Sequence, residues 1–166
     1  QAKLAEMGAR TYTIDAGLDR AAKDIHNYID NLLESGKTHQ EAELEAFSEY
    51  AIEAAILKVY GSETSQFVTD EGIQIFGGMG FSKDTPMEAA WRDARITRIY
   101  EGTNEINRML SVGMLIKKAM KGHVDLLGPA TAVADELMGI PSFDTPDYSE
   151  LFAEEKEMIA KMKKVF

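Results

Sequence analysis

One pattern near the start of the chain limits its fold more than any other feature. Apolar or small side chains recur at alternating intervals of three and four residues over eight turns of sequence. These positions are Leu4, Met7, Thr11, Ile14, Leu18, Ala21, Ile25, Tyr28 and Leu32. Such spacing places the side chains on a single face of a helix. We therefore expect a long amphipathic helix that ends at Ser35 and Gly36, because glycine commonly terminates helices.

The segment that follows carries a helix-start signature and a second helical pattern. Thr38 and Glu41 have the spacing of a capping box. Helical spacing then continues to the glycine-rich residues 77–80 and predicts one long helix, with a break near Gly61 as an alternative. Residues 73–76 also suit a short strand. A helix is favoured there, because no nearby segment offers a strand partner.

Two further helices follow from their capping residues. Thr85 and Pro86, with Glu88 behind them, predict the start of a helix that ends near residue 101. Thr103 is expected to cap the next helix, which runs to the lysines before Gly122.

Beyond Gly122 the long helical pattern stops, and short helices are expected over 130–139 and 148–164. The sequence therefore predicts an all-α fold. Residues 1–121 form an up-and-down four-helix bundle in this prediction, and residues 122–166 form a helical extension.

Charge and composition exclude several classes of protein. The 166 residues hold 18 Lys and Arg against 28 Asp and Glu, a net charge of −10, which argues against a nucleic-acid partner. Cysteine is absent, so thiol nucleophiles and Cys-ligated metals are excluded. No metal site is expected, since no histidine follows a glutamate at the di-iron spacing. The stripe Glu41, Glu45, Glu49 and Glu53 is interpreted as a solvated face.

Three motifs between residues 74 and 108 carry the candidate chemistry. In order, they are Gln74-Ile75-Phe76-Gly77-Gly78-Met79-Gly80, Arg92-Asp93-Ala94-Arg95-Ile96 and Tyr100-Glu101-Gly102-Thr103-Asn104-Glu105-Ile106-Asn107-Arg108. Each motif alone is readily explained as a turn, a salt-bridged face or a helix end. Together and in this order they resemble the C-terminal domain of the acyl-CoA dehydrogenases. The resemblance covers about residues 1–120, and residues 52–74 are most similar to very-long-chain members, which also carry a C-terminal extension.

The resemblance implies a function and a set of site residues. Members of this family bind FAD and oxidise a fatty acyl-CoA thioester to its trans-2-enoyl form. Glu101 matches the catalytic base, and Gly102 matches a residue that contacts the substrate thioester region. Tyr100, next to the base, is expected to supply part of the wall of the substrate site. Flavin contacts are implied, partly toward a neighbouring subunit, for Gln74, Ile75, Phe76, Gly77, Gly78, Thr103, Asn104 and Glu105. Glu105 departs from the members that carry Gln at this position.

A carboxylate suits the role implied for Glu101. The α-proton of a thioester is weakly acidic, so its removal needs a positioned base in a site that excludes water. Burial and apolar neighbours raise the pKa of such a carboxyl group. The predicted helix end at Glu101 is expected to act in the same direction.

The resemblance also implies partners and a larger protein. We expect a fatty acyl-CoA substrate, an electron-transfer flavoprotein as acceptor, and a homodimer or homotetramer. The N-terminal and middle domains of the parent are absent from these residues, so the chain alone is expected to be inactive. A soluble protein of the bacterial cytoplasm or the mitochondrial matrix is expected. The alternative is a non-catalytic helical assembly module, which the retention of Glu101, Gly102 and Thr103 together disfavours.

Overall fold

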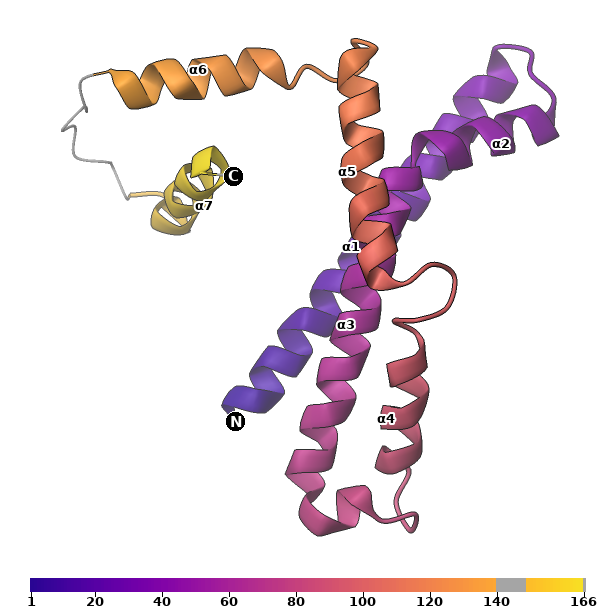
Figure 1. Ribbon diagram of the computed structural model, residues 1–166, viewed down its shortest axis with the longest axis vertical. Coiled ribbons are helices and arrows are strands. Elements are labelled where there is room, and N and C mark those ends of the chain that lie inside the picture. The colour runs from indigo at the N-terminus through magenta and orange to yellow at the C-terminus, as the bar shows by residue number, and fades with distance from the viewer. Residues whose placement is uncertain (140–148, 166) are drawn as a thin grey trace. The chain divides into compact units, whose positions relative to one another are not determined.

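The chain is all-helical in the residues that a computed structural model describes, 1–139 and 149–165 (Figure 1). The elements are α1 (Ala2–Glu34), α2 (His39–Glu49), α3 (Ala51–Phe76), the 3₁₀ segment η1 (Gly77–Phe81), α4 (Met87–Ile96), α5 (Asn104–Met120), α6 (Leu127–Met138) and α7 (Ala153–Val165). No strand occurs within the described ranges, and residues 73–76 belong to α3. The predicted all-α class is confirmed.

The chain divides into two compact units, Gln1–Lys117 and Lys118–Phe166. The first unit holds α1 to α4 and most of α5, and the second holds α6 and α7. These two last helices lie close to the two short helices expected after Gly122, and residue 148, the expected start of the second, lies outside the described residues. In the part of the chain that is described, no helix is long and apolar enough to cross a membrane.

Helix α3 is the centre of the first unit, in contact with α1, α2, α4 and η1 (Figure 1). Small residues let its neighbours approach closely. A Cβ atom on Gly17 of α1 would lie 2.9 Å from a methyl carbon of Leu57, and one on Gly72 of α3 would collide with the end of Met87 in α4. Side chains at these positions would displace the ends of Leu57 and Met87, so the glycines leave room for them.

The predicted second helix is divided at Tyr50 and not at Gly61. Tyr50 lies between α2 and α3, and its ring packs edge-on against Tyr28 of α1 with the ring centroids 5.9 Å apart. Gly61 instead lies inside α3, where a Cβ atom would stand 3.4 Å from Ile14. The glycine therefore lies where α1 packs on α3 and does not interrupt the helix.

The capping box at the start of α2 is confirmed. The Thr38 hydroxyl accepts a hydrogen bond from the Glu41 backbone N–H at 3.4 Å, and the Glu41 carboxylate accepts one from the Thr38 backbone N–H at 3.0 Å. The Thr38 hydroxyl also donates to that carboxylate. These bonds hold the pKa of Glu41 below its ordinary value.

We expect Thr38→Ala to destabilise the first turn of α2 by about 1 kcal/mol. The Glu41 backbone N–H loses its acceptor, the Thr38 hydroxyl, and the Glu41 carboxylate loses the donor that this hydroxyl provides. Hydrogen exchange of the amides at 41 and 42 should become roughly fivefold faster, as 1.4 kcal/mol corresponds to a factor of ten. Thr13→Ala, within α1, is the control and should leave exchange in α2 unchanged. Equal exchange rates in Thr38→Ala and the unsubstituted chain would show that the box does not hold this turn.

Candidate functional site

The candidate site is built on the loop between α4 and α5, residues 97–103. Helix α4 ends at Ile96, five residues before Glu101, so the prediction of a helix end near residue 101 is wrong. Residues 97–100 continue as hydrogen-bonded turns, with the Ile99 N–H donating to the Ile96 carbonyl at 2.9 Å. The Asn104 N–H then donates to the Arg98 carbonyl at 3.1 Å and closes the loop.

Glu101 and Gly102 reverse the chain by adopting left-handed backbone conformations. Their φ angles are 54° and 81°. A positive φ is strained for a residue with a side chain, and such strain collects at functional sites. Gly102 is required for a second reason, since a Cβ atom there would lie 3.1 Å from Nδ2 of Asn107.

Polar side chains from α3 and α5 hold this reversal. Lys58 Nζ donates to the Gly102 carbonyl at 2.8 Å and to Asn104 Oδ1 at 3.0 Å. Asn107 Nδ2 donates to the same Gly102 carbonyl at 2.8 Å. Asn104, whose side chain is wholly buried, donates from Nδ2 to the Ser62 hydroxyl at 2.9 Å. The loop is thus fixed from two helices.

An ion-pair cluster lies next to these hydrogen bonds. Both carboxylate oxygens of Glu63 accept from the Arg108 guanidinium at 2.9 Å, and Arg98 lies 3.7 Å away. Asn104 Nδ2 is 3.3 Å from the same carboxylate. Hydrogen bonding from Arg108 is the main cause that holds the pKa of Glu63 below its ordinary value. The cluster ties α3 to the start of α5.

This cluster predicts a loss of order in acid. The folded state lowers the pKa of Glu63, so its contribution to stability is complete above the unfolded value, about 4.3, and disappears as the pH falls through the folded value. We expect amide exchange in residues 98–108 to accelerate relative to α1 below about pH 4. Glu63→Gln should show faster exchange already at neutral pH and a smaller acid effect. The same acid response in Glu63→Gln and in the unsubstituted chain would contradict this assignment.

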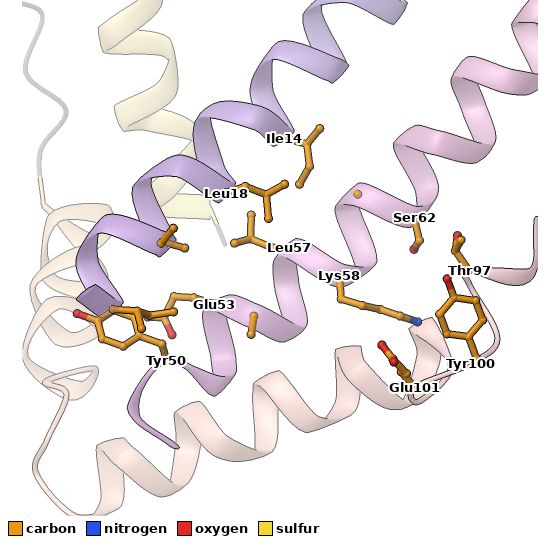
Figure 2. Close-up of a pocket in the computed structure, with 15 residues that line it drawn as sticks. Ile14, Leu18, Tyr50, Glu53, Leu57, Lys58, Ser62, Thr97, Tyr100 and Glu101 are labelled. Atoms are coloured by element: carbon orange, nitrogen blue, oxygen red, sulfur yellow. The ribbon is translucent and has the colours of Figure 1, made fainter. Parts of the chain in front are cut away.

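An open cleft of about 530 Å³ lies in front of the loop, between α1 and α3 (Figure 2). The α1 wall is apolar, and the α3 wall adds polar groups. The lining residues are Ile14, Leu18, Ala21, Ala22, Ile25, Tyr50, Glu53, Ala54, Leu57, Lys58, Gly61, Ser62, Thr97, Tyr100 and Glu101. Tyr100 and Glu101 lie together beside the end of the Lys58 side chain, while Glu53 lies farther along α3 (Figure 2). The cleft therefore presents one carboxylate from the loop next to a largely apolar surface.

The predicted segment Gln74–Gly78 lies elsewhere on the first unit. Lys58 and Gln74 are 16 residues apart on α3, which is about 24 Å at the helical rise. Gly77, with φ of 60°, ends α3, and no atom lies within 4 Å of the place that a Cβ would occupy on Gly77 or Gly78. Ile75 and Phe76 are exposed. The structure thus leaves this segment open and does not bring it to Glu101.

The residues of the second predicted flavin segment, Thr103, Asn104 and Glu105, differ in their exposure to solvent. Thr103 caps α5, accepting from the Ile106 N–H at 3.2 Å. The Glu105 carboxylate accepts from its own backbone N–H and from the Thr103 hydroxyl, which lowers its pKa. Asn104 exposes 0% of its surface, and its side chain serves the packing of the loop. The flavin contact of Asn104 stays a prediction.

Sequence reasoning missed the residues of α3 that hold the loop. The sequence pattern assigns no role in the site to Lys58, Ser62 or Glu63. A signal was present, because Lys58 and Ser62 fall at positions where the spacing calls for apolar side chains. Lys58 is also the single base among the residues numbered 38–74, which hold eight acids.

Comparisons with known proteins agree with this architecture. Residues 1–115 match the acyl-CoA dehydrogenase C-terminal domain. A probable acyl-CoA dehydrogenase of Bacillus subtilis (strain 168) is 35% identical over 165 residues, which cover 99% of this chain and 27% of that protein. The mitochondrial very long-chain specific acyl-CoA dehydrogenase of Rattus norvegicus is 44% identical over 93 residues, which cover 56% of this chain and 14% of that protein.

A solved structure shows the same fold. The crystal structure of an acyl-CoA dehydrogenase from Bacillus anthracis complexed with FAD has a TM-score of 0.88 and 39% identity, over 98% of this chain and 27% of that one. The chain belongs to the acyl-CoA dehydrogenase family. It spans about a quarter of the length of the Bacillus relatives.

Proposed function

We propose that the chain is the C-terminal helical part of an FAD-dependent acyl-CoA dehydrogenase in which Glu101 removes the α-proton of a fatty acyl-CoA. One observation carries this proposal. A loop held from two helices presents Glu101, in a strained left-handed conformation, beside a cleft with an apolar wall. Membership of the family supports the reaction class.

The chemistry proposed for this chain is a proton transfer. The bond between the α-carbon and its hydrogen breaks, and the proton passes to a carboxylate oxygen of Glu101. Bound FAD supplies the acceptor for the hydride that leaves the β-carbon, so the product is a trans-2-enoyl thioester. The apolar side chains of α1 suit a hydrocarbon chain and exclude water from the carboxylate once the cleft is covered. Tyr100 and Gly102 flank the base.

The residues present fit FAD at two places. The open backbone of Gly77 and Gly78, beside the exposed side chains of Ile75 and Phe76, allows a flat group to approach closely. Gln74 adds a hydrogen-bonding amide at the same end of α3. Thr103 and Glu105 offer polar atoms at the start of α5, where the ionised carboxylate disfavours a phosphate contact.

The separation of these two segments supports a shared cofactor site. About 24 Å of α3 separates Lys58, which lies beside Glu101, from Gln74. A flavin ring beside Glu101 is therefore out of close reach of Gln74–Gly78 of the same chain. We propose that a second copy supplies that segment, in a homodimer or homotetramer. The proposed electron acceptor is an electron-transfer flavoprotein.

The remaining parts of the proposal concern the whole protein. Residues 1–121 form the family bundle and residues 122–166 an extension, with further domains supplied by the full-length parent. Glu101 is exposed in this chain, so the chain alone is proposed to be inactive. Bacterial cytoplasm or mitochondrial matrix is the proposed location. The direct test is Glu101→Gln in the full-length parent, where persistence of the normal rate of flavin reduction by acyl-CoA would favour the alternative, a non-catalytic helical assembly module.

A further inference from the structure

Lys58 occupies an unusual position for a lysine. It is half-buried on α3, lines the cleft, and directs its ammonium group at the loop that carries Glu101 (Figure 2). Removing an ammonium group from water is costly unless acceptors replace the lost hydration. Here the acceptors are the Gly102 carbonyl at 2.8 Å and Asn104 Oδ1 at 3.0 Å. Both acceptors belong to the loop and its closing residue.

The charged groups around Lys58 show that its ammonium group does not act through an ion pair with Glu101. Within the described residues Lys58 and Glu101 form no ion pair, although both line the cleft. Glu53 on α3 and Tyr50 before it face the same cleft, and α1 contributes only apolar side chains. Glu63 is already engaged by Arg108 and Arg98. The ammonium group is therefore committed to the backbone and amide of the loop.

We infer that Lys58 is a positioning residue for Glu101, an inference that rests on the proposed function. By clamping the carbonyl that directly follows the Glu101–Gly102 pair, Lys58 fixes the peptide plane that ends the left-handed reversal. The strain of that reversal is released if the plane rotates, and the carboxylate then loses its orientation. Misplacement of a catalytic group by about 1 Å can cost about a hundredfold in rate.

The fold does not depend on Lys58 alone, which makes the inference testable. Asn107 also donates to the Gly102 carbonyl, and Ser62 also bonds Asn104. Lys58→Met, which keeps the chain length but removes the donors and the charge, should therefore fold and bind FAD. Lys58→Arg keeps both donors and charge. Lys23→Met, an exposed position of α1, is the matched control.

The experiment measures flavin reduction by an acyl-CoA after rapid anaerobic mixing with the full-length holoenzyme, as a function of the acyl-CoA concentration. We expect Lys58→Met to be about tenfold to a hundredfold slower. The acyl-CoA concentration that half-saturates flavin reduction should stay within severalfold of that of the unsubstituted enzyme, because the apolar wall of the cleft on α1 is unchanged. Lys58→Arg should stay within severalfold of the unsubstituted enzyme, and Lys23→Met should match it.

Three outcomes would overturn the inference. They are a normal rate in Lys58→Met, a slow rate that is fully restored by a higher acyl-CoA concentration, and a Lys58→Arg variant as slow as Lys58→Met. If Lys58→Met fails to fold, Lys58→Gln, which keeps a donor group but no charge, takes its place with the same expected loss of rate. Glu101→Gln separates the two levels. If Glu101→Gln reduces the flavin at the normal rate, the proposed function fails. If Glu101→Gln is slow while Lys58→Met is normal, the proposed function stands and only the role of Lys58 is refuted.

Discussion

Glu101→Gln in the full-length parent is expected to slow flavin reduction by acyl-CoA about a hundredfold to ten-thousandfold. Glutamine keeps the shape of the side chain and fits the same left-handed position beside the cleft. Its amide cannot accept the α-proton, so the loss measures the proton transfer and not a change of fold. The readout is the disappearance of the oxidised flavin absorbance after anaerobic mixing.

The cleft itself offers a matched control for this substitution. Glu53→Gln makes the same chemical change in another carboxylate that lines the same cleft from α3 (Figure 2). We expect its rate to stay within severalfold of the unsubstituted enzyme, with the same bound FAD. If Glu53→Gln were the inactive variant, the base would have to be assigned to α3 and not to the loop.

Asn104→Ala is expected to cause the largest loss of local stability. Asn104 exposes 0% of its surface, and its amide bonds Lys58, Ser62 and Glu63. Alanine would leave buried polar groups without this partner, at a cost of about 2–3 kcal/mol. Exchange of the amides in residues 98–107 should accelerate roughly 30- to 150-fold, since 1.4 kcal/mol is a factor of ten.

The control for this prediction is Asn27→Ala, the same change at an exposed position of α1. Its effect should stay within about 0.5 kcal/mol, as is usual for surface positions. Hydrogen exchange in the full-length parent measures both variants. Equal protection of residues 98–107 in the two variants would mean that Asn104 does not hold the loop.

The helices were predictable because local physics determines them. The three–four spacing of α1 and the capping box at Thr38 each specify a structure without reference to distant residues. The break at Tyr50 and the continuity through Gly61 could not be predicted in this way. Both depend on contacts with α1, through Tyr28 and Ile14, that exist only after the helices have packed.

The candidate site was predictable by motif and not by geometry. The motif around Glu101 marked the segment, but it did not indicate the end of α4 at Ile96, the left-handed pair or the hydrogen bond from the Asn104 N–H to the Arg98 carbonyl. The burial of Asn104 likewise depends on Lys58 and Ser62, more than 40 positions away in sequence. Linear spacing carries no information about such pairings.

The most direct measurement of the central claim follows the α-proton alone. A substrate analogue with sulfur in place of the β-carbon has no β-hydrogen to transfer, so only removal and return of the α-proton remain. Nuclear magnetic resonance in deuterated water then records how fast the full-length holoenzyme exchanges the α-hydrogen. We predict rapid exchange in the unsubstituted enzyme and in Glu53→Gln, and none above the uncatalysed rate in Glu101→Gln. Exchange at the unsubstituted rate in Glu101→Gln would show that another group takes the proton.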